Sequence, residues 1–155
     1  MTWFEVTDES EATVAAGRQE VWDVLTDPEA LVRMTPFLQS IDVDGDHWTW
    51  RLGVIKALGK SVAPSFTERM RFEDLELIEF DHDPAEPDGE TAGVDGSYRL
   101  SDADDGGTAL AISFTVRVRL PLPRAAKIGV HTAMRGVLAR MGDGFGKNLT
   151  KELAR

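Results

Sequence analysis

Three side chains with acid–base chemistry fall at positions where the surrounding sequence pattern is apolar. His131 lies among apolar residues spaced three and four apart, and Asp8 lies on the apolar side of an alternating N-terminal segment. A histidine there can hydrogen-bond a ligand or act as a general acid or base, whereas a buried carboxylate requires a partner. Together with Tyr98 and Arg135, these residues are candidates for one polar cluster. The alternative is that each is an ordinary core residue paired with its surroundings.

Metal and nucleotide chemistry find no support in the sequence. Cysteine is absent, and His47, His82 and His131 are far apart along the chain. The acidic segments 42–44 and 81–83 do not match a calcium loop and are explained by turns. The sequence has no Gly-x-Ser-x-Gly, phosphate loop or Gly-x-Gly-x-x-Gly, so hydrolase and nucleotide-binding functions are not indicated. We therefore expect no metal and no cofactor.

The N-terminal third of the sequence predicts a strand followed by two short helices. Residues 4–14 alternate with a period of two, which is typical of a strand with one polar face, and Gly17 ends it. Residues 18–26 form an amphipathic helical pattern. Pro28 ends that helix at Asp27, because proline disfavours helical conformation in the residue before it. Asp27 as N-cap and Pro28 in the first turn then begin a second helix, which stops at Thr35-Pro36.

Strands and one long helix account for the rest of the chain. The predicted strands cover residues 37–43, 47–58, 61–72, 75–81, 91–100 and 108–120. A helical pattern runs over residues 124–153, and five glycines within it predict a kink or weak point at residues 141–146. Its apolar stripe consists of Ile128, His131, Met134, Leu138, Met141, Phe145, Leu149 and Leu153.

Composition predicts a single domain over residues 1–155 in the cytoplasm. The net charge of −10 argues against nucleic-acid binding. No apolar run is long enough for a membrane span, and the acidic N-terminus is unlike a signal peptide. Residues 73–105 are strongly acidic, whereas residues 121–155 are rich in Lys and Arg. The two segments either complement each other, or the basic helix docks on an acidic protein partner.

The stretch ATVAAGRQEVWDVLTDPEAL, residues 12–31, resembles the opening of the START, birch-pollen-allergen and polyketide-cyclase superfamily (SRPBCC). Within it, the sequence is similar to polyketide cyclase/dehydrase-like proteins and to proteins like the G-type subunit of carbon monoxide dehydrogenase. The resemblance implies an α+β helix-grip fold, in which a curved antiparallel sheet of about seven strands wraps around a long C-terminal helix. The two short helices after the first strand would close one end of that sheet.

The resemblance also implies a cavity between sheet and helix that binds an apolar or aromatic small molecule. The residues expected to line it are Trp48, Trp50, Phe66, Met70, Tyr98, Phe114, Val116, His131, Met134, Arg135, Leu138 and Met141. Binding of a lipid-like or polyketide-like ligand is the main hypothesis. One alternative is a cyclase, aromatase or dehydratase that uses His131 with Tyr98 or Asp8. The other is an interaction protein that docks through its basic C-terminal helix.

Overall fold

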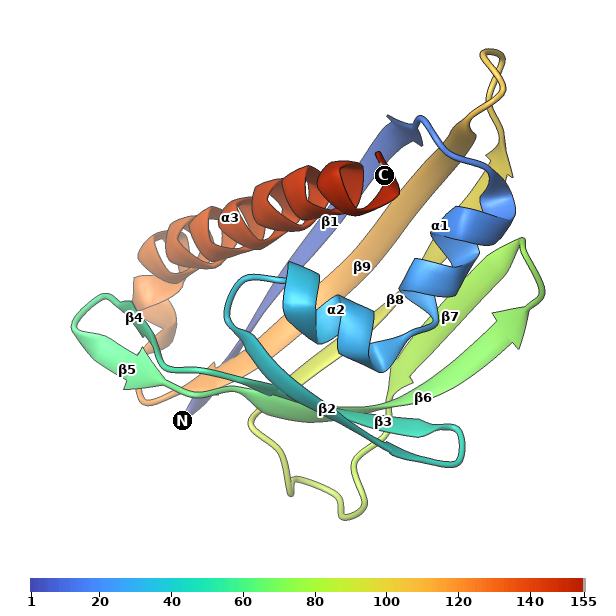
Figure 1. The fold of residues 1–155 in the computed structure, drawn as a ribbon. Helices are drawn as coiled ribbons and strands as arrows, with labels where there is room; N and C mark the ends of the chain where they lie inside the picture. The colour runs from blue at the N-terminus through green and yellow to red at the C-terminus, as the bar shows by residue number, and fades with distance from the viewer. Residues whose placement is uncertain (155) are drawn as a thin grey trace.

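A seven-stranded antiparallel sheet forms the body of the molecule. The computed structural model describes residues 1–154. The sheet order is β1-β9-β8-β7-β6-β3-β2, and Figure 1 shows the sheet curving beneath the long helix α3. Its strands are β1 (Thr2–Val14), β2 (Leu38–Asp44), β3 (His47–Leu52), β6 (Ser65–Glu73), β7 (Leu77–His82), β8 (Ala92–Asp102) and β9 (Thr108–Leu120). The predicted α+β helix-grip architecture is confirmed.

The two short helices are α1 (Arg18–Leu25) and α2 (Pro28–Met34). The Asp27 carboxylate accepts a hydrogen bond from the backbone N–H of Glu29 at 3.1 Å, and Pro28 occupies the first turn of α2. The N-cap satisfies a donor that has no partner within the helix, and the proline prevents α1 from continuing. The predicted corner at Asp27-Pro28 is therefore present.

The C-terminal helix follows a short 3₁₀ turn, η1 (Arg124–Ala126), and runs unbroken as α3 (Lys127–Leu153). The expected weak point at residues 141–146 is absent, and the helix is continuous there (Figure 1). Contacts with α2 hold this part of α3 in place. The Asn148 amide donates to the Met34 carbonyl oxygen at 2.8 Å, and Arg33 pairs with Glu152 at 2.6 Å. No helix within residues 1–154 is long and apolar enough to span a membrane.

A small hairpin replaces the long strands predicted over residues 47–58 and 61–72. It consists of β4 (Ile55–Ala57) and β5 (Lys60–Val62), which form their own two-stranded sheet. Its turn holds Leu58 and Gly59 at positive φ values of 53° and 72°, a backbone geometry suited to tight hairpins. The hairpin lies beside the start of α3 (Figure 1).

The apolar face of α3 differs from the predicted stripe at its N-terminal end. Ile128 is 83% exposed, whereas Val130 is 1% exposed and packs in a cluster with Phe4 and Leu120. Val130 and Met134 are themselves four residues apart, so this region offered two apolar stripes. Packing against the ends of β1 and β9 selected the one that contains Val130.

Asp8 is exposed, although Phe4 and Val6 on the same strand are buried. β1 is an edge strand that pairs only with β9. Its inner face is covered near its beginning and open to solvent from Thr7 onward. The alternation of β1 therefore predicted the face of Asp8, but the face is not covered at that position.

Candidate functional site

Two adjoining cavities lie between the sheet and α3. One has a volume of about 190 Å³ and extends from α1 and α2 across the middle of the sheet. The other, of about 160 Å³, extends toward the β4–β5 hairpin and the start of α3. They share the lining residues Leu52, Phe66, Val94, Val116, Leu138 and Met141. We call the first the central cavity and the second the hairpin cavity.

Most residues expected from the sequence line one or both cavities. Those in the central cavity are Trp48, Trp50, Phe66, Met70, Tyr98, Phe114, Val116, Leu138 and Met141, and Met134 lines the hairpin cavity. His131 and Arg135 line neither cavity. Arg135 is exposed and His131 is partly buried. The polar cluster predicted from Asp8, Tyr98, His131 and Arg135 is thus not assembled, because only Tyr98 reaches a cavity.

Glu68 is the polar residue that the sequence interpretation missed. It lies on β6 between Phe66 and Met70, lines the central cavity and is only 2% exposed. Across the ladder its partners are Trp48 on β3 and His82 on β7. Within residues 1–154 its carboxyl group makes no hydrogen bond or ion pair with another side chain. Alternation carried a usable signal, because two residues that face the cavity flank Glu68 at period two.

The surroundings of Glu68 favour its neutral form. Burial raises the pKa of its carboxyl group well above the ordinary value, and the carboxylates of Asp95 and Asp81 raise it further. Tyr98 lines the same cavity, and its pKa is raised by burial and then by Glu68. The central cavity therefore presents a carboxylic acid and a phenol, both able to donate a hydrogen bond.

Aromatic rings hold these polar groups in place. Trp50 stacks on Phe66 with ring centroids 6.2 Å apart and an interplanar angle of 12°. Phe80 packs against Tyr98 at 5.2 Å, and Trp48 is 6.3 Å from Trp50. The buried indole nitrogen Nε1 of Trp50 has no hydrogen-bond partner within the described chain. A third donor thus lies in the wall of the cavity without a protein acceptor.

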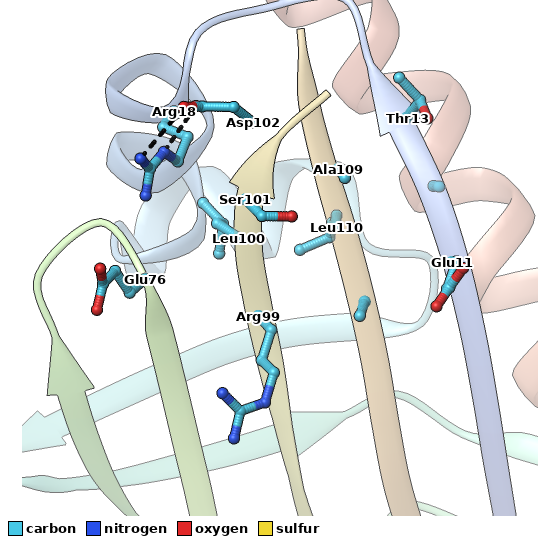
Figure 2. Close-up of a pocket in the computed structure, with 12 residues that line it drawn as sticks. Glu11, Thr13, Arg18, Glu76, Arg99, Leu100, Ser101, Asp102, Ala109 and Leu110 are labelled. Carbon is cyan, nitrogen blue, oxygen red and sulfur yellow. Dashed lines mark hydrogen bonds and ion pairs between the residues drawn. The ribbon is translucent and has the colours of Figure 1, made fainter. Parts of the chain in front are cut away.

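A wider groove of about 740 Å³ lies on the opposite face of the sheet, near the start of α1. Figure 2 shows its lining, which includes Arg99, Glu76 and the ion pair of Arg18 with Asp102 at 2.9 Å. These charged side chains are largely exposed, and small alanines of β9 form the floor. The groove is open and already solvated, whereas the central cavity holds buried polar groups without partners. The inner cavities are therefore the better candidate site.

A curved sheet closed by two short helices and crossed by a long helix, with cavities between, defines a helix-grip domain of the START-like class. The chain belongs to the polyketide cyclase/dehydrase and lipid transport family, whose profile matches residues 5–153. No curated protein sequence matches this chain.

Solved structures share the fold at low sequence identity. A conserved protein from Geobacillus kaustophilus superposes with a TM-score of 0.75 at 19% identity, covering 96% of this chain and 95% of the other. The Zhui aromatase/cyclase from a Streptomyces species gives 0.70 at 17% identity, covering 97% and 94%. A START superfamily protein from Mycobacterium smegmatis gives 0.66 at 16% identity, covering 97% of each chain. These likenesses show the fold alone.

Proposed function

We propose that the protein binds an apolar or aromatic small molecule, lipid-like or polyketide-like, in the cavities between the sheet and α3. The observation that carries this proposal is the pair of adjoining cavities, of about 190 and 160 Å³, with a mostly apolar lining. An engineered apolar cavity of roughly 150 Å³ is large enough to bind benzene. The family description, which includes lipid transport, supports the same class of ligand.

The energetics of the cavities support occupation. Empty cavity volume costs about 24 cal/mol per Å³, so 190 Å³ left empty costs roughly 5 kcal/mol. That is a large part of the about 5–15 kcal/mol that stabilises a typical domain. A ligand that fills the space restores the lost dispersion contacts. Binding should therefore also raise the melting temperature.

A cyclase or aromatase activity on a polyketide-like substrate is the second candidate. The observation in its favour is that Glu68 and Tyr98 line the same apolar cavity, where a proton donor can reach a substrate carbonyl. The Zhui neighbour is itself an aromatase/cyclase. Such an activity would use Glu68 and Tyr98 rather than His131 and Asp8. The first candidate predicts retention of ligand without turnover, whereas the second predicts a product of changed mass.

The test is binding of the neutral fluorescent probe N-phenyl-1-naphthylamine, with native mass spectrometry of the purified protein to find any copurified molecule. Val116→Phe fills space at the junction of the two cavities. Val43→Phe is the matched control, because Val43 is 53% exposed on β2 and lines neither cavity. We expect Val116→Phe to weaken probe binding at least tenfold and Val43→Phe to leave it unchanged. Equal binding by both variants, with both shown to be folded, would rule out the inner cavities as the site.

A further inference from the structure

The central cavity has polar and apolar parts. Glu68, Tyr98 and the indole N–H of Trp50 lie in its wall, whereas the rest of its lining is almost entirely apolar. Neither Glu68 nor Tyr98 bonds a side chain or backbone group through its terminal oxygens, among the hydrogen bonds of residues 1–154. Buried polar groups are normally hydrogen-bonded, and each one left unpaired costs about 1–3 kcal/mol. A bound molecule with an oxygen atom near these groups would supply the missing partner.

The charges around this polar part decide what kind of oxygen fits. The lining of the central cavity contains no Lys, Arg or His among the described residues. The carboxylates closest in effect to Glu68 are Asp95 and Asp81, both negative. Asp95 is already paired with Arg117 at 2.7 Å. An anionic ligand head would thus be desolvated without a cation to pair with, which is strongly unfavourable.

We propose that this cavity selects neutral oxygen-bearing ligands, with a phenol or ketone oxygen bound by Glu68, Tyr98 and Trp50 and an apolar body directed toward the hairpin cavity, and that it rejects carboxylates. The proposal rests on the proposed function, since it specifies the ligand of the same site. Neutral Glu68 donates its O–H to a ketone oxygen, and its carbonyl oxygen accepts from a phenol O–H. Either mode occupies the polar groups without adding charge.

Lys60 offers the one competing arrangement. It lines the hairpin cavity at its far end, on β5. A carboxylate ligand could reverse its orientation and place its anion at Lys60, leaving the apolar end beside Glu68. That arrangement would leave Glu68, Tyr98 and Trp50 without partners. The proposal therefore predicts weaker binding of a carboxylate than of a phenol of the same size.

The experiment compares three probes of one shape: naphthalene, 2-naphthol and 2-naphthoate, titrated near pH 6 and followed by quenching of tryptophan emission. We expect 2-naphthol to bind at least tenfold more tightly than naphthalene or 2-naphthoate. Glu68→Leu should remove the preference for 2-naphthol over naphthalene, and Glu68→Gln should keep most of it. Glu73→Leu, an exposed position on the same strand, is the matched control and should retain the preference.

Other outcomes separate this proposal from the proposed function. If all three probes bind equally, or if 2-naphthoate binds best, the cavity binds ligands but the selectivity is overturned. If none binds, the proposed function itself fails. Tyr98→Phe removes only a hydroxyl, so it provides the test if Glu68→Leu does not fold. An unchanged preference for 2-naphthol in a folded Glu68→Leu, or in Tyr98→Phe where Glu68→Leu does not fold, would show that water alone satisfies these groups.

Discussion

Gly144 of α3 lies directly against the ring of Pro36, which follows α2. A Cβ atom at Gly144 would come well inside van der Waals contact with the proline Cγ. Gly146, two residues further on, has no neighbouring atom within 4 Å of such a position. The same helix thus contains one glycine that its packing requires and one that it does not.

Alanine substitutions at these two positions should change stability in opposite directions. Gly144→Ala must push α3 away from Pro36, and we expect it to lower the free energy of unfolding by about 1–3 kcal/mol. Gly146→Ala should raise it by up to about 1 kcal/mol, because alanine favours the helix. Urea denaturation measures both. A stabilising Gly144→Ala would mean that α3 does not approach Pro36 this closely.

Local sequence signals were sufficient for most of the fold. Asp27-Pro28 encodes its corner through capping and a missing N–H, and those effects need no tertiary contact. The identity of the exposed residues was harder to predict. Ile128 and Val130 both belong to plausible helical stripes, and only packing against β1 and β9 distinguishes them. Likewise, whether Asp8 is covered depends on how far α3 extends over β1.

The candidate site was predictable in its apolar part but not in its polar part. Aromatic residues at period two identified the cavity walls, including Trp50 and Phe66. Glu68 has the same period, but a charged residue type suggested the solvent side. His131 was favoured because it interrupts an apolar stripe, yet it lines neither cavity. Residue type and periodicity conflict at a buried carboxyl group, and such conflicts often mark functional positions.

Thr108 anchors the segment between β1 and α1 to β9. Its side chain is fully buried, and its hydroxyl donates to the Ala16 carbonyl oxygen at 2.7 Å. Thr108→Val keeps the shape but leaves that carbonyl without this donor, so we expect a loss of about 1–3 kcal/mol in the free energy of unfolding. Thr115→Val is the control, because its hydroxyl pairs with Thr7 at an exposed position. Thermal denaturation should show a larger loss for Thr108→Val, and equal losses would contradict this role.

His47 bridges two loops by contacts with two carboxylates. Its Nε2 lies 2.8 Å from Asp83 and its Nδ1 lies 2.9 Å from Asp46. The hydrogen bond with Asp83 is the largest cause that raises the pKa of His47 above its ordinary value, and Asp46 adds to it. Asp83→Asn should therefore lower the pKa more than Asp46→Asn does. NMR titration of the imidazole signals measures both shifts, and the reverse order would contradict the assignment.

Glu68 should make stability depend on pH. Burial raises its pKa in the folded protein, so folding holds a proton that the unfolded chain releases. Its contribution to stability is fully present below the ordinary glutamate pKa and is lost as pH rises through the raised folded value. Glu68→Gln cannot titrate. The variant should therefore gain stability relative to the native protein as pH rises, by at most about 1.4 kcal/mol per pH unit.

Urea denaturation of both proteins between about pH 4 and pH 8 gives the difference directly. All other carboxyl groups are common to the two proteins, so their titration cancels in the comparison. The difference should be smallest near pH 4, where Glu68 is protonated in both states, and should increase toward neutral pH. A difference that stays constant over this range would mean that Glu68 ionises as readily in the folded protein as in the unfolded chain. The carboxyl group would then be charged in the cavity, and it could not donate a hydrogen bond to a ligand.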